Sequence, residues 1–257
     1  MNSWDLYIYF LLPTIVALVF SFVFAAKKVV SMPKVLLFAG LAIVVFATFI
    51  VLLWSTLSRP PMRTMGETRL LYSLFLMIVG LLVWKKSGFR LVLGFSYLLA
   101  IIFMLINLFK PQIHVQELMP ALQSIWFVPH VVVYMISYAL IGSAFLIAVG
   151  VDKRAGNRLF YCDALINYGL ALLTMGMVMG ALWAKAAWGD YWAWDPKEVW
   201  AAITWAFGLI YIHFRKSSPK NEIIAYICVV VMFISFQICW YGINYLPTSV
   251  NSVHTYL

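Results

Sequence analysis

Long apolar segments recur from one end of the chain to the other, and they constrain the fold more than any other feature of the sequence. Runs of about 20 apolar residues match a hydrocarbon core roughly 30 Å thick. Across 257 residues the chain is 65% hydrophobic and only 11% charged, with a mean hydropathy of +0.95. Because membrane-spanning strands are short and alternate in polarity, this pattern predicts an all-α, polytopic membrane protein.

About eight transmembrane helices are predicted from these runs. The first run lacks the basic start and the small-residue cleavage site of a signal peptide, so we expect it to be retained. We see neither a repeat nor a soluble segment, and we expect one transmembrane domain over residues 1–257. The predicted helices span residues 7–26, 35–54, 70–84, 90–109, 130–151, 166–185, 196–214 and 223–243.

The basic residues gather in alternate loops. Twelve of the 18 Lys and Arg residues follow the first, third, fifth and seventh predicted helices, and six lie on the other side. The positive-inside rule places the twelve in the cytoplasm, so both termini are predicted on the outer, periplasmic side. This pattern accounts for the net charge of +9 without a nucleic-acid partner. The predicted location is the inner membrane of a bacterium, with the lipid bilayer as a partner.

A dense aromatic stretch, WGDYWAWDPKEVW at residues 188–200, falls in the predicted outer loop between the sixth and seventh helices. Six of the 11 tryptophans lie between residues 183 and 205. An interfacial aromatic belt is one interpretation, but a belt is distributed over many helices. A flat ligand that stacks on aromatic faces is the other interpretation, and it fits one crowded loop better.

The DPKE segment within this stretch predicts the start of a helix. Asp195 suits the N-cap, Pro196 the first helical position, and Glu198 completes a capping-box pattern. A helix that starts here also offers free N–H groups to an anionic ligand group.

The four histidines fall at different predicted depths. His130 opens the fifth helix at its outer end, and His254 lies in the outer tail. His213 lies near the cytoplasmic end of the seventh helix, and His114 lies in an outer loop. Imidazole is the usual axial ligand of haem iron, so two outer histidines beside an aromatic loop suggest a haem site. A cytochrome b would need histidine pairs within two helices, about 13 residues apart, and this sequence has none.

The stretch WGDYWAWDPKEVWAAITW, 188–205, resembles the tryptophan-rich signature of the WWD haem-handling proteins, in the form found in the CcsA/ResC branch of system II cytochrome c synthases. Three further segments resemble that family. They are RPPMRTMGETRLLYS (59–73), MPALQSIWFVPHVVVYMISYA (119–139) and SVNSVHTYL (249–257).

The resemblance implies a role for individual residues. His130 and His254 match the two external axial ligands of the haem iron. His213 matches a transmembrane histidine that binds haem on its way out, whereas His114 matches no ligand position. The tryptophan-rich cradle is matched by Trp188, Trp192, Trp194, Asp195 and Trp200.

The function implied by the resemblance is export of haem b and its presentation at the outer face. There it is joined to the CxxCH cysteines of an apocytochrome c. The chain would then be one subunit of a holocytochrome c synthase, or cytochrome c haem lyase, and would need a CcsB/ResB-type partner. Two alternatives remain open: a haem carrier that delivers haem to a chaperone without forming thioether bonds, and an assembly scaffold that binds no haem.

Overall fold

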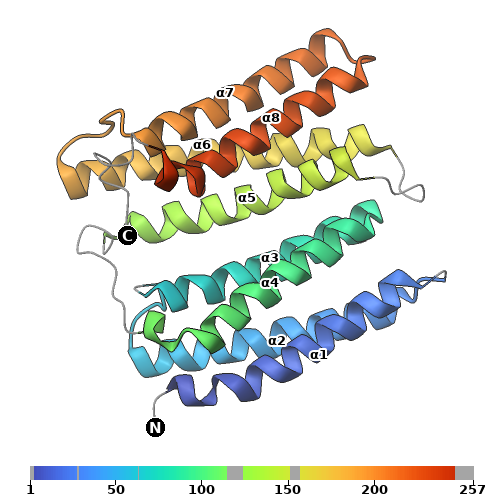
Figure 1. Cartoon of the computed structure of the whole chain (residues 1–257), viewed down its shortest axis with the longest axis vertical. Helices are drawn as coiled ribbons and strands as arrows, with labels where there is room; N and C mark the ends of the chain where they lie inside the picture. Colours follow the sequence, from blue (N-terminus) through green and yellow to red (C-terminus); the bar gives the residue numbers. More distant parts are fainter. Residues whose placement is uncertain (1–2, 28, 63, 115–123, 151–156, 247–257) are drawn as a thin grey trace. The chain divides into compact units, whose positions relative to one another are not determined.

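The computed structural model describes residues 3–27, 29–62, 64–114, 124–150 and 157–246, and every regular element in these ranges is a helix (Figure 1). Short 3-10 helices, η1 (Ser3–Leu6), η2 (Pro111–His114) and η4 (Gly242–Tyr245), accompany the α-helices. The all-α prediction is confirmed. The α-helices are α1 (Tyr7–Ala26), α2 (Met32–Leu57), α3 (Met65–Ser87), α4 (Arg90–Phe109), α5 (Phe127–Val149), α6 (Arg158–Trp188), α7 (Pro196–Ser217) and α8 (Glu222–Trp240).

The eight helices follow the predicted spans, and two of them differ clearly at their ends. Helix α3 begins at Met65 rather than at residue 70, because Thr64 caps its first turn. Helix α6 begins at Arg158 rather than at residue 166, because the side chain of Asn157 accepts a hydrogen bond from the Phe160 N–H. Hydropathy detects only the apolar part of a helix, whereas caps set its physical ends.

Seven of the helices in the described ranges, all except α7, are long and apolar enough to cross a membrane. Helix α7 carries Glu198 in its first turn and Arg215 and Lys216 in its last turn. The chain is therefore a polytopic membrane protein. The side of the membrane on which the termini lie stays a prediction.

The helices form two compact units, residues 1–123 and residues 124–257. Unit 1 contains α1 to α4, and unit 2 contains α5 to α8. In each unit the first helix packs on the second, the third packs on the fourth, and the first also packs on the fourth. This is the pairing of an antiparallel four-helix arrangement. The single haem-handling domain over residues 1–257 stays a prediction.

Hydroxyl groups join the helices inside unit 1. The Tyr7 hydroxyl on α1 donates to the carbonyl oxygen of Met104 on α4, at 2.9 Å. The Ser73 hydroxyl on α3 donates to the carbonyl oxygen of Ala100 on α4, at 3.2 Å. Apolar contact alone gives little preference between helices and lipid, so such bonds help to fix which helix packs on which.

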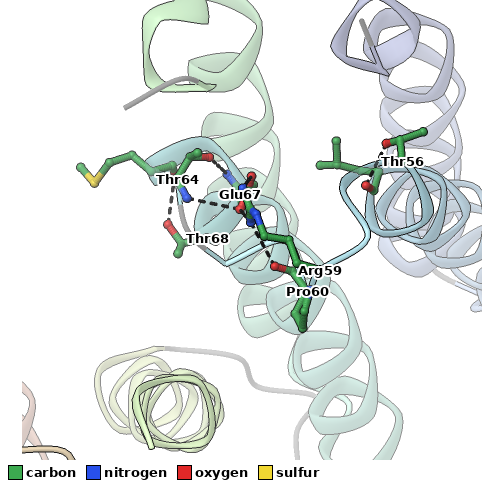
Figure 2. Close-up of polar contacts among 8 residues, drawn as sticks. Thr56, Arg59, Pro60, Thr64, Glu67 and Thr68 are labelled. Carbon is green, nitrogen blue, oxygen red and sulfur yellow. Dashed lines mark hydrogen bonds and ion pairs between the residues drawn. The ribbon is translucent and has the colours of Figure 1, made fainter. Parts of the chain in front are cut away.

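A buried carboxylate fixes the start of α3 (Figure 2). Glu67 is only 1% exposed. Its oxygens accept hydrogen bonds from both terminal nitrogens of Arg59, at 2.9 and 3.0 Å, and from the Thr64 N–H at 3.2 Å. The Thr64 hydroxyl in turn accepts from the Glu67 N–H at 3.1 Å. The charge of Glu67 is thus compensated, and the loop before α3 is tied to its first turn.

His114 holds the end of unit 1 together. Its ring lies parallel to the Trp4 indole, with centroids 3.6 Å apart. Its Nε2 lies 3.0 Å from the carbonyl oxygen of Asn107. Since a carbonyl oxygen can only accept, Nε2 carries the proton. Burial lowers the pKa of His114, because the charged ring would lose its hydration. His114 is therefore a packing residue that joins η1 to the end of α4.

We expect unit 1 to become less stable as the pH is lowered, because of the His114 side chain. A histidine whose pKa is lowered in the fold binds fewer protons there than in the unfolded chain. Its contribution is therefore complete above the unfolded pKa of about 6.5 and is lost as the pH falls below it. Thermal unfolding of the detergent-solubilised protein between pH 5 and pH 8 measures this dependence. The variant His114→Phe should reduce the slope, whereas an undiminished slope in that variant would contradict the assignment.

Candidate functional site

The aromatic stretch lies at one end of unit 2. Helix α6 ends at Trp188, the loop 189–195 follows, and α7 begins at Pro196. His130 is the fourth residue of α5, which starts at the same end because neighbouring helices in this unit run antiparallel. The fold therefore brings one predicted iron ligand and the predicted cradle to the same end of one four-helix unit.

The loop starts at a glycine that the turn requires. Gly189 has a φ of 94°, a left-handed conformation that costs a residue without a Cβ very little. Its N–H donates to the carbonyl oxygen of Lys185, and the Lys185 ammonium donates to the Gly189 carbonyl oxygen at 2.5 Å. The same ammonium lies 5.4 Å from the centroid of the Tyr191 ring. Lys185 thus supports the first half of the loop.

The end of the loop is the predicted capping box. The Asp195 side chain accepts from the Lys197 N–H at 2.9 Å, and the Glu198 side chain accepts from the Asp195 N–H at 3.1 Å. Pro196 occupies the first helical position. The predicted start of this helix is confirmed. Asp195 is 7% exposed, so its role in the structure is that of a buried cap.

Between these two anchors the tryptophans divide into packed and exposed rings. Trp183 is 4% exposed, whereas Trp194 is 73% exposed. Trp192 is half-buried and meets Trp194 edge to face, with centroids 6.0 Å apart. Trp194 also has a φ of 58°, a conformation that costs a residue with a side chain about 1–2 kcal/mol. An exposed indole on a strained backbone is a feature that packing alone does not explain.

His130 is oriented by a backbone carbonyl and surrounded by aromatic rings. Its Nδ1 lies 2.7 Å from the carbonyl oxygen of Gly176 on α6, and since a carbonyl oxygen can only accept, Nδ1 carries a proton. Trp183 lies nearly parallel to the imidazole at 5.7 Å, and Tyr134 meets it edge to face at 4.5 Å. Trp183 in turn contacts Trp188 at 4.6 Å. A continuous series of ring contacts therefore links the imidazole to the cradle.

Two glycines on α6 make room for these rings. A Cβ on Gly180 would lie 2.7 Å from Cε1 of His130, and a Cβ on Gly176 would lie 3.1 Å from the Tyr134 ring. The spacing of four residues places both glycines on one face of α6. The sequence patterns considered above predict no individual role for Gly176, Gly180, Trp183 or Tyr134. The signal that could have found the glycines is the GxxxG spacing of GMVMG, residues 176–180.

Three predicted site residues, Trp200, His254 and His213, are not part of these ring contacts in the described structure. Trp200 is half-buried and lies five residues after the N-cap of α7. His254 lies outside the described residues, so its pairing with His130 stays a prediction.

His213 lies at the opposite end of unit 2, near the end of α7. From Pro196 to His213 the helix rises about 25 Å, at 1.5 Å per residue. Tyr211 is buried and donates to Asp163 on α6 at 2.6 Å, and Arg215 forms an ion pair with the same carboxylate at 2.9 Å. His213 is exposed between these two residues in sequence. Because neighbours two apart on a helix point in nearly opposite directions, His213 faces away from α6.

A comparison with protein families matches residues 63–250 to the model described as "Cytochrome C assembly protein". The chain is 33% identical over 247 residues to the cytochrome c biogenesis protein CcsA of Chlamydomonas reinhardtii, covering 88% of this chain and 69% of that protein. It is 29% identical over 321 residues to the CcsA of Cyanophora paradoxa, covering 98% of this chain and 96% of that protein.

A solved structure with a similar fold is the cytochrome c heme lyase CcmF, with a TM-score of 0.72 and 16% identity. The likeness covers 93% of this chain and 46% of that chain, and at this identity it shows the fold alone. The family match spans most of the chain, including the aromatic loop and the helix that carries His130. The chain therefore belongs to the cytochrome c assembly protein family, as a CcsA-type cytochrome c biogenesis protein.

Proposed function

We propose that this protein exports haem b and presents it at the outer face of the membrane, as one subunit of a holocytochrome c synthase. The observation that carries the proposal is the environment of His130. Its imidazole is oriented through Nδ1 and lies in ring contact with the tryptophans that lead into the aromatic loop. The specific role in haem export, and the partners of this chain, are proposed from this site and from the family.

The residues present suit haem as the substrate. A haem-ligating histidine usually donates its other ring N–H to a carbonyl or carboxylate, which fixes the tautomer and the ring orientation. The bond from Nδ1 to Gly176 is of this kind, and Nε2 of His130 would then be the atom that ligates the iron. The indoles of Trp188, Trp192 and Trp194 would hold the flat, apolar macrocycle, and His254 would supply the second axial imidazole.

The chemistry to be performed is thioether formation. Each of the two CxxCH thiols adds across one haem vinyl group, so that one C–S bond forms and the thiol hydrogen passes to the other vinyl carbon. The contribution of this chain would be placement, because a fixed haem edge beside a bound peptide raises the effective concentration of the reactants. The partners that this reaction requires are an apocytochrome c and a CcsB/ResB-type membrane subunit. The bacterial inner membrane stays a prediction.

His213 would serve a separate inner site. It lies about 25 Å from the start of α7, which is further than one haem iron can bridge. Its exposure on the surface of unit 2 suits a ligand held against a partner subunit, and a role in reaching the lipid headgroups is the competing explanation.

The variants His130→Ala and His254→Ala test the outer site. We expect haem affinity to fall by at least about tenfold in each, because an axial ligand is lost. Added imidazole should restore part of the occupancy by filling the vacated axial position. The measurements are haem content, the visible spectrum, and covalent holocytochrome formed together with the partner subunit. Full haem content with an unchanged spectrum in both variants would overturn the outer-site assignment. Haem bound without holocytochrome would favour the carrier.

Gly180→Ala tests the placement of the imidazole without removing any ligand. The new methyl group would lie 2.7 Å from the His130 ring, so the ring must move and haem affinity should fall by about tenfold. Gly142→Ala on α5 is the matched control, since its methyl group would meet only Phe233 at an ordinary 3.7 Å. A haem titration of both purified variants makes the comparison, and equal affinities would exclude a role for the close approach of Gly180.

His213→Ala tests the inner site. The outer site should then receive little haem from inside the cell, yet it should bind haem added from outside. Haem at the outer site is quantified by its visible spectrum, with and without external haem. Normal loading from endogenous haem would contradict the inner site, whereas no loading under either condition would indicate misfolding.

A further inference from the structure

The strained residue of the aromatic loop is held by one carboxylate oxygen. Oε2 of Glu198 accepts a hydrogen bond from the Ala193 N–H at 2.9 Å and another from the Asp195 N–H at 3.1 Å. These two N–H groups belong to the residues on either side of Trp194. The carboxylate therefore closes a ring of hydrogen bonds around the one residue of the loop that has a side chain and a left-handed backbone.

A capping box alone does not require the bond to Ala193. The box needs only the bond to the N-cap N–H, here that of Asp195. The box at the start of α3 offers a comparison within the same chain. There Glu67 accepts from its N-cap, Thr64, and from the Arg59 guanidinium. In α7 the equivalent glutamate accepts from its N-cap, Asp195, and also from Ala193, two residues earlier in the aromatic loop.

Two features of Trp194 cost free energy, and a relaxed backbone would remove the strain. The left-handed conformation is strained, and a large indole that is 73% exposed loses the benefit of burial. A change of φ to the ordinary negative range would redirect the Cβ and carry the indole elsewhere. The two bonds to Glu198 oppose that change, because hydrogen bonds to an ionised carboxylate are among the strong ones.

We propose that Glu198 is a positioning residue for Trp194: it holds the left-handed backbone so that the indole stays presented on the loop, where a planar ligand stacks on it. The ligand in question is haem, so this inference rests on the function proposed above. The alternative is that Glu198 serves only to start α7. That alternative predicts no specific effect on Trp194, because Asp195 caps the helix through its own side chain.

The conformational claim can be tested without haem. The protein is labelled with 5-fluorotryptophan, and the ¹⁹F resonance of Trp194 is identified by its loss in Trp194→Phe. We expect Glu198→Ala to shift or broaden this resonance while the other tryptophan resonances remain, which also shows that the variant is folded. Glu198→Gln keeps an oxygen that can accept both N–H groups, so it should retain the native resonance. An unmoved Trp194 resonance in Glu198→Ala would overturn the proposal.

The functional claim is tested by a haem titration of Glu198→Ala, Trp194→Ala and the double variant. Each single variant should bind haem more weakly by between about fivefold and thirtyfold. The double variant should bind no more weakly than Trp194→Ala, because Glu198 acts through that indole. If the loss of haem affinity in the double variant equals the product of the two single losses, the two residues act independently and the proposal is overturned. Failure of the proposed function appears separately, as unchanged haem binding in His130→Ala.

Discussion

Hydrogen bonding of backbone groups at the helix ends is the constraint on which the rest of this structure depends. Inside a bilayer each helix satisfies its own backbone, but its first N–H groups and last carbonyl groups need other partners. Arg90 donates to the carbonyl oxygens of Ala26 and Lys27 at the end of α1. Arg158 donates to the carbonyl oxygens of Ile147 and Ala148 at the end of α5. In each unit the first residue of another helix thus closes the end of the first helix.

A capping box starts the third helix of each unit, and its glutamate has a different second partner in each. Both third helices begin with a capping box, formed by Thr64 and Glu67 in α3 and by Asp195 and Glu198 in α7. In α3 the glutamate is buried and neutralised by an arginine. In α7 it binds the backbone of the aromatic loop. A common solution to helix initiation therefore ties the loop to an arginine pair in one unit and holds the candidate haem loop in the other.

Two histidines near helix ends each bind a backbone carbonyl oxygen but have different surroundings. His114 uses Nε2 to bind a carbonyl oxygen and stacks flat on Trp4, so its ring is committed to packing. His130 uses Nδ1 for its carbonyl bond, and its Nε2 would ligate the iron in the proposed site. Because an imidazole can ligate a metal through either nitrogen, the surroundings of the ring distinguish the two: a flat stack on Trp4 for His114, and a series of rings leading to the aromatic loop for His130.

The sequence by itself determined the all-α membrane fold, the approximate helix boundaries and the start of α7, because hydropathy and capping act over a few neighbouring residues. The WWD-like stretch also gave the family. Only the tertiary structure placed His130 against Gly176 and Gly180 and linked it through Trp183 to the cradle, since those contacts join residues about 50 positions apart on separate helices. Only the structure showed the left-handed backbone of Trp194, although its contacts are local in the sequence. Such a conformation is rare for tryptophan, and it persists here because Glu198 binds both flanking N–H groups.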